Sequence, residues 1–462
     1  MTALNRDTAG VESHLPIKVI QFGEGNFLRA FADWMIDLLN EKSHFGSGVA
    51  VVQPIEQGML PQLEEQQGLY HLLIRGLADG EVVNQTRLIS CIQKTVNPFI
   101  ELQAYFELAE NPEINLIISN TTEAGIEFDR KDIPQSGELA GTFPGKLTQL
   151  LWKRFQFFKG AATAGVGIIP CELIDRNGDK LKQAILQYAE LWDLPEEFIN
   201  WVNQSIYFAN TLVDRIVPGY PGEEIEQIQH ELGYQDQLVV SAEAFHLWII
   251  EGPKKLQQLF PANDIGLNVK FVADQTPYRT RKVRILNGAH TAMVAVGTLA
   301  GLETVKETIE HPEVGSFIKE LIFEEVIPTI DLPIEELHHF ANEVMERFMN
   351  PFIRHELQSI SLNSISKFKV RVLPSLLDYM DQNQTAPKRL CKAFASLIRF
   401  YQLGAQGKFP LKDDPKHLAF FSSLGTDIDG DLLVSKVLGN QHMWGQDLSQ
   451  NQSLLKAVTE AL

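Results

Sequence analysis

The apolar residues in the first half of the chain form short runs separated by polar stretches. Four runs have the length and continuous apolar character of strands buried on both faces: 17–22, 49–52, 114–119 and 166–170. Residues 27–39 follow the first run and carry apolar side chains at helical spacing, which predicts one helix. Buried strands that alternate with helices are typical of a parallel sheet, so we expect an α/β fold with a Rossmann-type sheet.

The pattern changes after about residue 277, where most apolar positions recur with helical spacing. Residues 316–327, 334–349 and 389–404 are the clearest predicted helices. We therefore predict two domains: a dinucleotide-binding α/β domain over residues 1–275 and a mostly α-helical substrate and catalytic domain over residues 276–462.

Composition narrows the class of protein. The 462 residues carry 59 acidic and 40 basic side chains, a formal charge of −19, which disfavours a nucleic-acid partner. The three cysteines are far apart and form no metal-ligand motif, so we expect neither disulfides nor a metal. No signal peptide and no run of eighteen apolar residues is visible, which predicts a cytoplasmic protein without a membrane partner. The sequence leaves the oligomeric state open.

A glycine-containing turn joins the first predicted strand to the first predicted helix. Gly23 would allow the tight turn, and Gly25 would let the backbone approach a pyrophosphate at the start of the helix. The motif is incomplete, because Leu28 stands where a third glycine or alanine is expected. A plain strand–helix turn in another α/β fold remains the alternative.

The second predicted strand is not followed by the acidic residue that usually binds the adenosine ribose. Glu56 is the nearest acid, and Pro54 intervenes. No Lys or Arg follows closely to bind a 2′-phosphate, so the sequence favours NAD over NADP mildly.

The segment 278–290 has the composition of a site for alcohol oxidation. Removing a hydroxyl proton as hydride leaves needs a base, and a lysine can serve if burial or nearby cations lower its pKa. Lys282 would be that base, with Asn287 and His290 holding the oxygen from one helix face. A basic helix face with a buried histidine is the alternative.

The spacing of Lys282, Asn287 and His290 resembles the Lys-x4-Asn-x2-His signature of the polyol-specific long-chain dehydrogenases, the mannitol dehydrogenase family. Segments 22–29, 213–216, 347–351 and 366–368 are similar to further family motifs, in family order. The resemblance implies a secondary-alcohol dehydrogenase that uses NAD and no metal, with Lys282 as general base and Asn287 and His290 as its partners.

The glycine turn with its flanks, and the end of the third strand, are the predicted cofactor contacts. They are Val19, Ile20, Gln21, Phe22, Gly23, Glu24, Gly25, Asn26, Phe27, Leu28, Arg29, Ala30, Asn120 and Thr122. Asp214 and Lys367 are the predicted substrate contacts, although Asp214 could instead pair with Arg215 in a structural role.

Longer stretches indicate the kind of substrate. Segments 20–31, 119–126, 169–175 and 285–292 are similar to family members that act on a hexuronate-derived sugar acid. The polyol enzymes carry an Asn and an Arg where this chain has Leu173 and Ser359, which argues against a mannitol-type substrate. We therefore expect a small-molecule sugar acid with a cation in its pocket, and an arginine could bind the carboxylate through two hydrogen bonds. The candidates form two basic groups, which could instead be solvated or paired with acids: Arg279, Arg281 and Arg284, and Lys367, Lys369 and Arg371.

Three alternatives stay open. The chain could be a family member that acts on another keto acid or on a polyol. It could be a nucleotide-binding regulator without turnover, for which Lys282 would be dispensable. A metal-dependent alcohol dehydrogenase is disfavoured by the missing ligand set.

Overall fold

The computed structural model describes the whole chain except residues 13–14, 122–124, 136 and 426–427. The chain forms two compact units. The first contains Met1–Arg75 and Val83–Gln275, and the second contains Gly76–Val82 and Thr276–Leu462. The segment Gly76–Val82 therefore belongs to the second unit, whereas a single boundary at residue 275 would assign it to the first.

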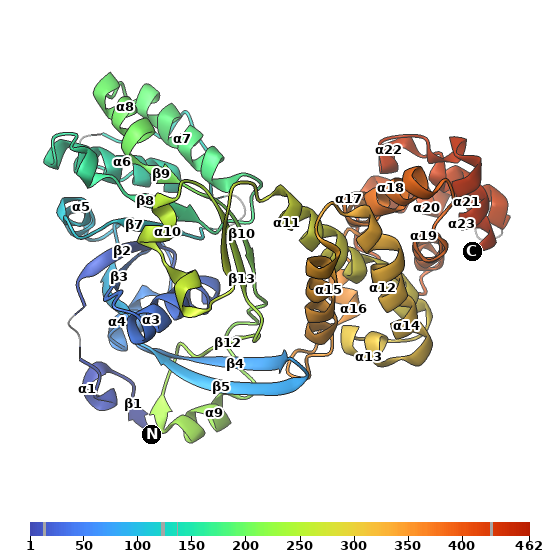
Figure 1. Cartoon of the computed structure of the whole chain (residues 1–462), viewed down its shortest axis with the longest axis horizontal. Coiled ribbons are helices and arrows are strands. Elements are labelled where there is room, and N and C mark those ends of the chain that lie inside the picture. The colour runs from blue at the N-terminus through green and yellow to red at the C-terminus, as the bar shows by residue number, and fades with distance from the viewer. Residues whose placement is uncertain (13–14, 122–124, 136, 426–427) are drawn as a thin grey trace. The chain divides into compact units, whose positions relative to one another are not determined.

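A six-stranded, wholly parallel sheet forms the centre of the first unit (Figure 1). Its spatial order is β6-β3-β2-β7-β8-β9. The strands are β2 (Ile17–Phe22), β3 (Gly48–Val52), β6 (Ile92–Val96), β7 (Leu116–Ser119), β8 (Gly167–Pro170) and β9 (Tyr207–Phe208). The chain starts in the middle and builds outward in both directions, so the strand order reverses between β2 and β7. The predicted Rossmann-type α/β fold is confirmed.

Alternate residues of these strands enter two separate apolar cores. Val19 and Val51 pack on one face, and Ile20 and Val52 pack on the other. The second core is completed by four helices (Figure 1): α5 (Leu102–Glu110), α6 (Phe143–Phe157), α7 (Asn177–Leu191) and α8 (Glu196–Ser205). Both faces are covered, which explains why the strands are continuous apolar runs.

The first core is closed by α3 (Ala32–Lys42) and by two further sheets. One sheet has the order β10-β13-β14 and the other β12-β4-β5. Their strands are β10 (Asn210–Asp214), β13 (Leu247–Glu251), β14 (Val269–Val272), β12 (Val240–Ala242), β4 (Tyr70–Ala78) and β5 (Glu81–Ile89). The remaining α-helices and strands described in this unit are β1 (Thr2–Ala3), α1 (Arg6–Ala9), α2 (Asn26–Arg29), α4 (Leu60–Glu65), α9 (Ile225–Leu232), β11 (Tyr234–Gln235) and α10 (Lys255–Leu259).

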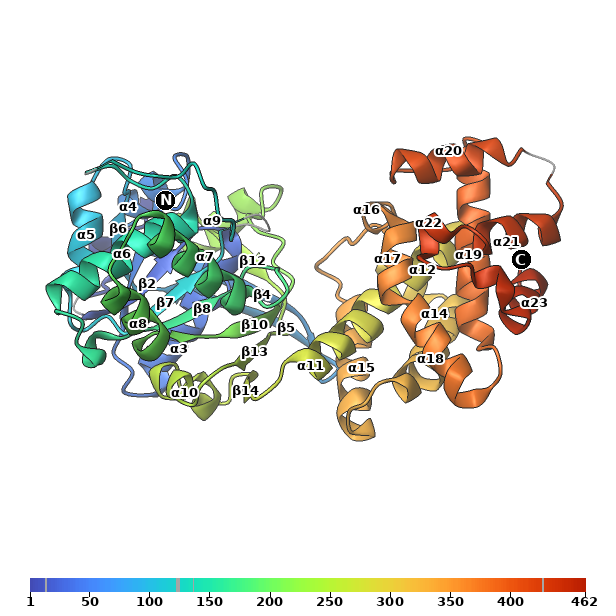
Figure 2. The same cartoon turned by 90° about the horizontal axis from the view of Figure 1, so that it is seen from above.

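The second unit is helical and is built around α12 (Gly288–Leu299) (Figure 2). Nine of its twelve residues are buried, as expected for a helix covered on all sides. The other helices are α11 (Thr276–Arg281), α13 (Val305–Glu310), α14 (Pro312–Glu320), α15 (Ile334–Phe348), α16 (Leu357–Ile360), α17 (Ser364–Arg371), α18 (Leu373–Asn383), α19 (Lys388–Ala405), α20 (Pro415–Ser423), α21 (Gly430–Leu438), α22 (Gln441–Trp444) and α23 (Gln452–Glu460).

Two of the predicted helices of this unit agree closely with α15 and α19. The helix expected at 316–327 instead becomes π-helical after α14, over Leu321–Val326. Inside this unit, the N–H of Gly80 donates a hydrogen bond to the Glu346 carboxylate at 3.0 Å. Within the described part of the chain, none of the helices combines the length and apolar character needed to cross a bilayer.

Candidate functional site

The turn after β2 requires glycine at its first position. Gly23 has φ +115°, and a Cβ there would lie 2.8 Å from the carbonyl oxygen of Asn120, at the end of the neighbouring strand β7. Gly25 has ordinary backbone angles, and a Cβ there would meet nothing within 4 Å. The turn is therefore closed against the sheet at Gly23 and open at Gly25, which is the arrangement a bound pyrophosphate needs.

The prediction of a single helix over 27–39 is wrong, because a turn interrupts the helix between α2 and α3. The carbonyl of Arg29 accepts a hydrogen bond from the Tyr70 hydroxyl at 2.8 Å, and the carbonyl of Ala30 accepts one from Arg215 at 2.6 Å. Both donors are buried and come from distant parts of the chain. They satisfy carbonyls that a continuous helix would have used itself.

This break also explains the missing third glycine. Leu28 is buried, and its Cδ1 lies 3.4 Å from the position of a Cβ on Gly23. A third glycine normally lets a continuous helix pack closely on the strand. Here the four-residue α2 ends before that contact would form, so a leucine can fill the space.

Arg29 supports the turn from inside the protein. Its guanidinium donates to the carbonyl of Glu24 at 3.1 Å, to the side chain of Asn26 at 2.7 Å and to the carbonyl of Leu238 at 2.5 Å. It also lies over the ring of Tyr70, at 5.0 Å from the centroid. With 1% of its surface exposed, Arg29 holds the turn in shape and does not face solvent.

The other predicted cofactor residues differ in how far their side chains are buried. Several have buried side chains that belong to the core or to the support of the turn; these are Val19, Ile20, Gln21, Phe22, Glu24, Leu28, Arg29 and Ala30. Phe27 stacks on Phe31 at 4.9 Å. Asn26 and Asn120 are half-buried beside the two glycines, and Thr122 lies outside the described residues.

The end of β7 is fixed by a residue that sequence reasoning left unassigned. The buried Glu172 carboxylate, just after β8, accepts hydrogen bonds at 3.0 Å from the Ser119 hydroxyl, the Thr121 hydroxyl and the Thr121 N–H. Burial raises the pKa of Glu172, and these donors oppose the rise. Its place after a parallel strand was the available signal, because carboxyl ends of such strands share one edge.

Among the described residues that directly follow β3, the nearest acid is the exposed Glu56. Gln53 is buried and donates to the carbonyls of Ile55 and Glu56 at 2.9 and 3.1 Å, whereas Glu56 itself is exposed. The amide of Gln53 thus shapes the loop where a ribose-binding carboxylate often stands.

The predicted catalytic residues lie on one continuous helical stretch that is not a regular α-helix. Lys282–Asn287 is π-helical, between α11 and α12. In a regular α-helix, Lys282 and His290 would be about 80° apart around the axis. A π-helical turn holds one extra residue, so the separation falls to about 20°, and Asn287 lies about 40° from Lys282. The π-helical segment therefore brings all three onto one face.

Their surroundings differ. His290 is buried, with its ring 4.5 Å from Phe348 and 5.0 Å from His355, so the Arg347–Pro351 motif contributes directly to its packing. Lys282 and Asn287 are half-buried. Across the described residues, no hydrogen bond occupies the Asn287 side-chain amide, which leaves it available to an added oxygen.

The predicted substrate residues lie in different units. Lys367 is on α17 in the second unit, and its ammonium donates to the carbonyl of Ile360 at 2.9 Å. Asp214 is buried at the end of β10 in the first unit. Arg215 is structural, because it bonds the carbonyls of Ala30 and Glu243 and lies 4.2 Å from the ring centroid of Trp34.

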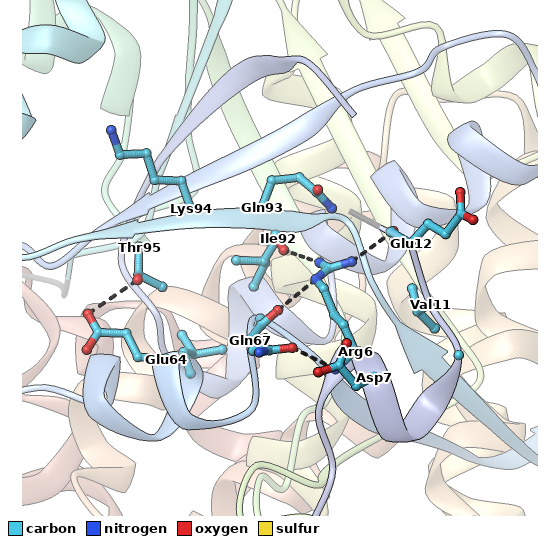
Figure 3. A pocket seen from close by; sticks show the side chains of 13 residues that line it. Arg6, Asp7, Val11, Glu12, Glu64, Gln67, Ile92, Gln93, Lys94 and Thr95 are labelled. Atoms are coloured by element: carbon cyan, nitrogen blue, oxygen red, sulfur yellow. Dashed lines mark hydrogen bonds between the residues drawn. The ribbon is translucent and has the colours of Figure 1, made fainter. Parts of the chain in front are cut away.

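One cavity of the first unit lies away from the glycine turn. It measures about 890 Å³ and is lined by α1, α4 and β6. Figure 3 shows the Arg6 guanidinium directed at carbonyls of Glu12, Gln67 and Ile92. These bonds already use most of the donors of Arg6, so its guanidinium is held by the backbone around it. In the described residues, no group of three or more potential ligands is placed to hold a metal.

The doubly wound sheet with its glycine turn, and the helical unit that carries Lys282, Asn287 and His290, define a two-domain oxidoreductase of the dinucleotide-binding class. The Rossmann domain of mannitol dehydrogenases matches residues 17–261, and their C-terminal domain matches residues 274–462. The chain belongs to the mannitol dehydrogenase family.

Two relatives that match nearly the full length of the chain are altronate oxidoreductases. The chain is 48% identical to an altronate oxidoreductase of Bacillus subtilis (99% of this chain, 94% of the relative). It is 46% identical to that of Yersinia enterocolitica (100% and 97%).

Two solved structures share the fold at 20% identity. A D-sorbitol dehydrogenase has a TM-score of 0.79, covering 98% of this chain and all of that one. Pseudomonas fluorescens mannitol 2-dehydrogenase with NAD and D-mannitol has a TM-score of 0.66, covering 100% and 96%.

Proposed function

We propose that this protein interconverts D-altronate and D-tagaturonate, with NAD as the hydride acceptor and without a metal. The observation that carries the proposal is the 46–48% identity, over nearly the full length, to several altronate oxidoreductases. The 20% identity to the sorbitol and mannitol enzymes supports the fold and not their substrates.

The first unit suits a dinucleotide. The strand order reverses between β2 and β7, and ligands of such sheets bind where the order reverses. At that place Gly23 closes the turn against Asn120, and Gly25 leaves its outer side open. NAD, when bound, supplies the carbon that accepts hydride. The loop after β3 has Gln53 where an acid often binds the adenosine ribose. The preference for NAD over NADP is therefore part of the proposal.

In the second unit, Lys282 removes the proton from the substrate hydroxyl as the hydride departs. Asn287 and His290 hold the same oxygen through hydrogen bonds, and they stabilise the partial charge that builds there. In the reverse direction Lys282 returns the proton to the ketone oxygen. The π-helical segment supports these roles because it sets the three side chains on one face.

Substrate choice is tested by following NADH oxidation with D-tagaturonate, D-fructuronate and D-fructose as acceptors. We expect tagaturonate to have the highest kcat/KM. A higher value for fructuronate would make the protein a fructuronate reductase, and a higher value for fructose would make it a polyol dehydrogenase. A protein that binds NADH but reduces none of the three would be a nucleotide-binding regulator. Loss of activity after chelation would refute the metal-free mechanism.

A further inference from the structure

Arginines close to the π-helical segment are already bound to carboxylates. Arg281 pairs with Glu336 at 2.7 Å. Arg284 pairs with Asp378 at 2.5 Å and also donates to the carbonyl of Thr329 at 3.1 Å. Because a carboxylate already balances the charge of each guanidinium, neither offers a strong site for another anion.

Arg371 differs from both. It is the last residue of α17 and is half-buried. Within the described part of the chain, its guanidinium has no hydrogen bond and no ion pair. Burial lowers its pKa, and no nearby carboxylate opposes that effect. In a chain with 59 acidic and 40 basic residues, a partly desolvated cation without an acidic partner needs an explanation.

Arg371 lies beside the proposed catalytic residues. Helix α17 packs against both the π-helical segment and α12. The carbonyl oxygen of Arg371 would be 3.0 Å from a Cβ on Gly288, so the two backbones touch next to Asn287. Lys367 precedes Arg371 by one helical turn, which places both cations on the same side of α17. Burial and the charge of Arg371 both lower the pKa of Lys367.

The inference from these observations concerns the substrate, and it rests on the proposed function. We propose that Arg371 binds the carboxylate of the sugar acid, next to Lys367, and so selects sugar acids over neutral sugars. A planar guanidinium can give a carboxylate two parallel hydrogen bonds, and the carboxylate balances its charge. A neutral sugar would leave the same cation partly desolvated and uncompensated.

The test compares D-tagaturonate with D-tagatose, the same ketose with CH2OH in place of the carboxylate. For Arg371→Gln we expect KM for tagaturonate to rise about 100-fold, with kcat within about fivefold and kcat/KM for tagatose within about threefold of wild type. Arg371→Lys, which keeps the charge but not the planar fork, should fall between the two. NADH affinity should be unchanged in both variants.

Lys369→Gln is the matched control, because it removes one positive charge from the same helix. We expect its tagaturonate KM to stay within about twofold of wild type. A tagaturonate KM within threefold of wild type in Arg371→Gln would overturn the assignment. An equal loss of kcat/KM for tagaturonate and tagatose would also overturn it, since that pattern indicates a structural role.

An error in the proposed substrate can be distinguished from an error in the role of Arg371. A wild-type protein that reduces fructuronate but not tagaturonate would refute the substrate proposed above. Arg371 would still be tested by the same variants, with fructuronate compared against fructose. A wild-type protein that prefers the neutral sugar in either pair would refute the carboxylate assignment directly.

Discussion

The two glycines of the turn give opposite predictions for the same substitution. In Gly23→Ala, the new Cβ would lie 2.8 Å from the Asn120 carbonyl, at a φ of +115° that other residues rarely adopt. Backbone strain of this kind costs about 1–3 kcal/mol, so we expect the free energy of unfolding to fall by at least that amount. In Gly25→Ala, the Cβ meets nothing and φ is −68°, so the loss should stay below about 1 kcal/mol.

NADH binding separates the variants further. If the pyrophosphate lies against Gly25, a methyl group there occupies ligand space, and the Kd for NADH should rise at least tenfold, about 1.4 kcal/mol. Urea unfolding gives the stability of each variant, and fluorescence titration gives the Kd. Gly25→Ala should thus be stable but weak in binding, while Gly23→Ala loses both. Wild-type NADH affinity in Gly25→Ala would refute the placement of the cofactor on this turn.

Three other predictions follow from buried polar groups and close contacts. Burial raises the pKa of Asp33 from its ordinary 3.8 to about 7, so the native state holds this proton more tightly than the unfolded state. Stability should therefore fall as pH rises from about 4 to 7, by at most about 4 kcal/mol; Asp33→Asn should remove that slope in urea unfolding at pH 5 and 8, and an unchanged slope would contradict the assignment. Tyr70→Phe removes the hydrogen bond to the Arg29 carbonyl and should cost about 1–3 kcal/mol in thermal or urea unfolding; no loss would mean that the break between α2 and α3 does not depend on it. Gly288→Ala pushes α17 away at the Arg371 carbonyl, so KM for tagaturonate should rise while NADH affinity stays constant; a parallel change in both would argue against a local effect.

Periodicity predicted the parts of the fold that depend on neighbouring residues. Strands β2, β3, β7 and β8 were expected within two residues of their bounds, because a strand buried on both faces must be apolar throughout. The hairpin of β4 and β5 was not expected. Strand β5 is largely exposed, so its sequence lacks the apolar run that marked the others.

Features that depend on distant partners were beyond the sequence. The break after Arg29 is stabilised by Tyr70 and Arg215, which no local pattern connects to it. The π-helical segment adds one residue to a turn without changing composition, so α-helical spacing puts Lys282 and His290 about 80° apart where the π-helical turn brings them to about 20°. The resemblance to the family implies the roles proposed for these residues, and the π-helical segment is a feature of the backbone that the resemblance did not indicate.

The role of Lys282 as general base is tested by measuring turnover and NADH binding in Lys282→Ala. If the amine of Lys282 takes the hydroxyl proton, kcat for altronate oxidation should fall by about 100- to 10,000-fold, while the Kd for NADH stays within threefold of wild type. Turnover within tenfold of wild type, with cofactor binding intact, would contradict the account, because the proton would then leave by another route.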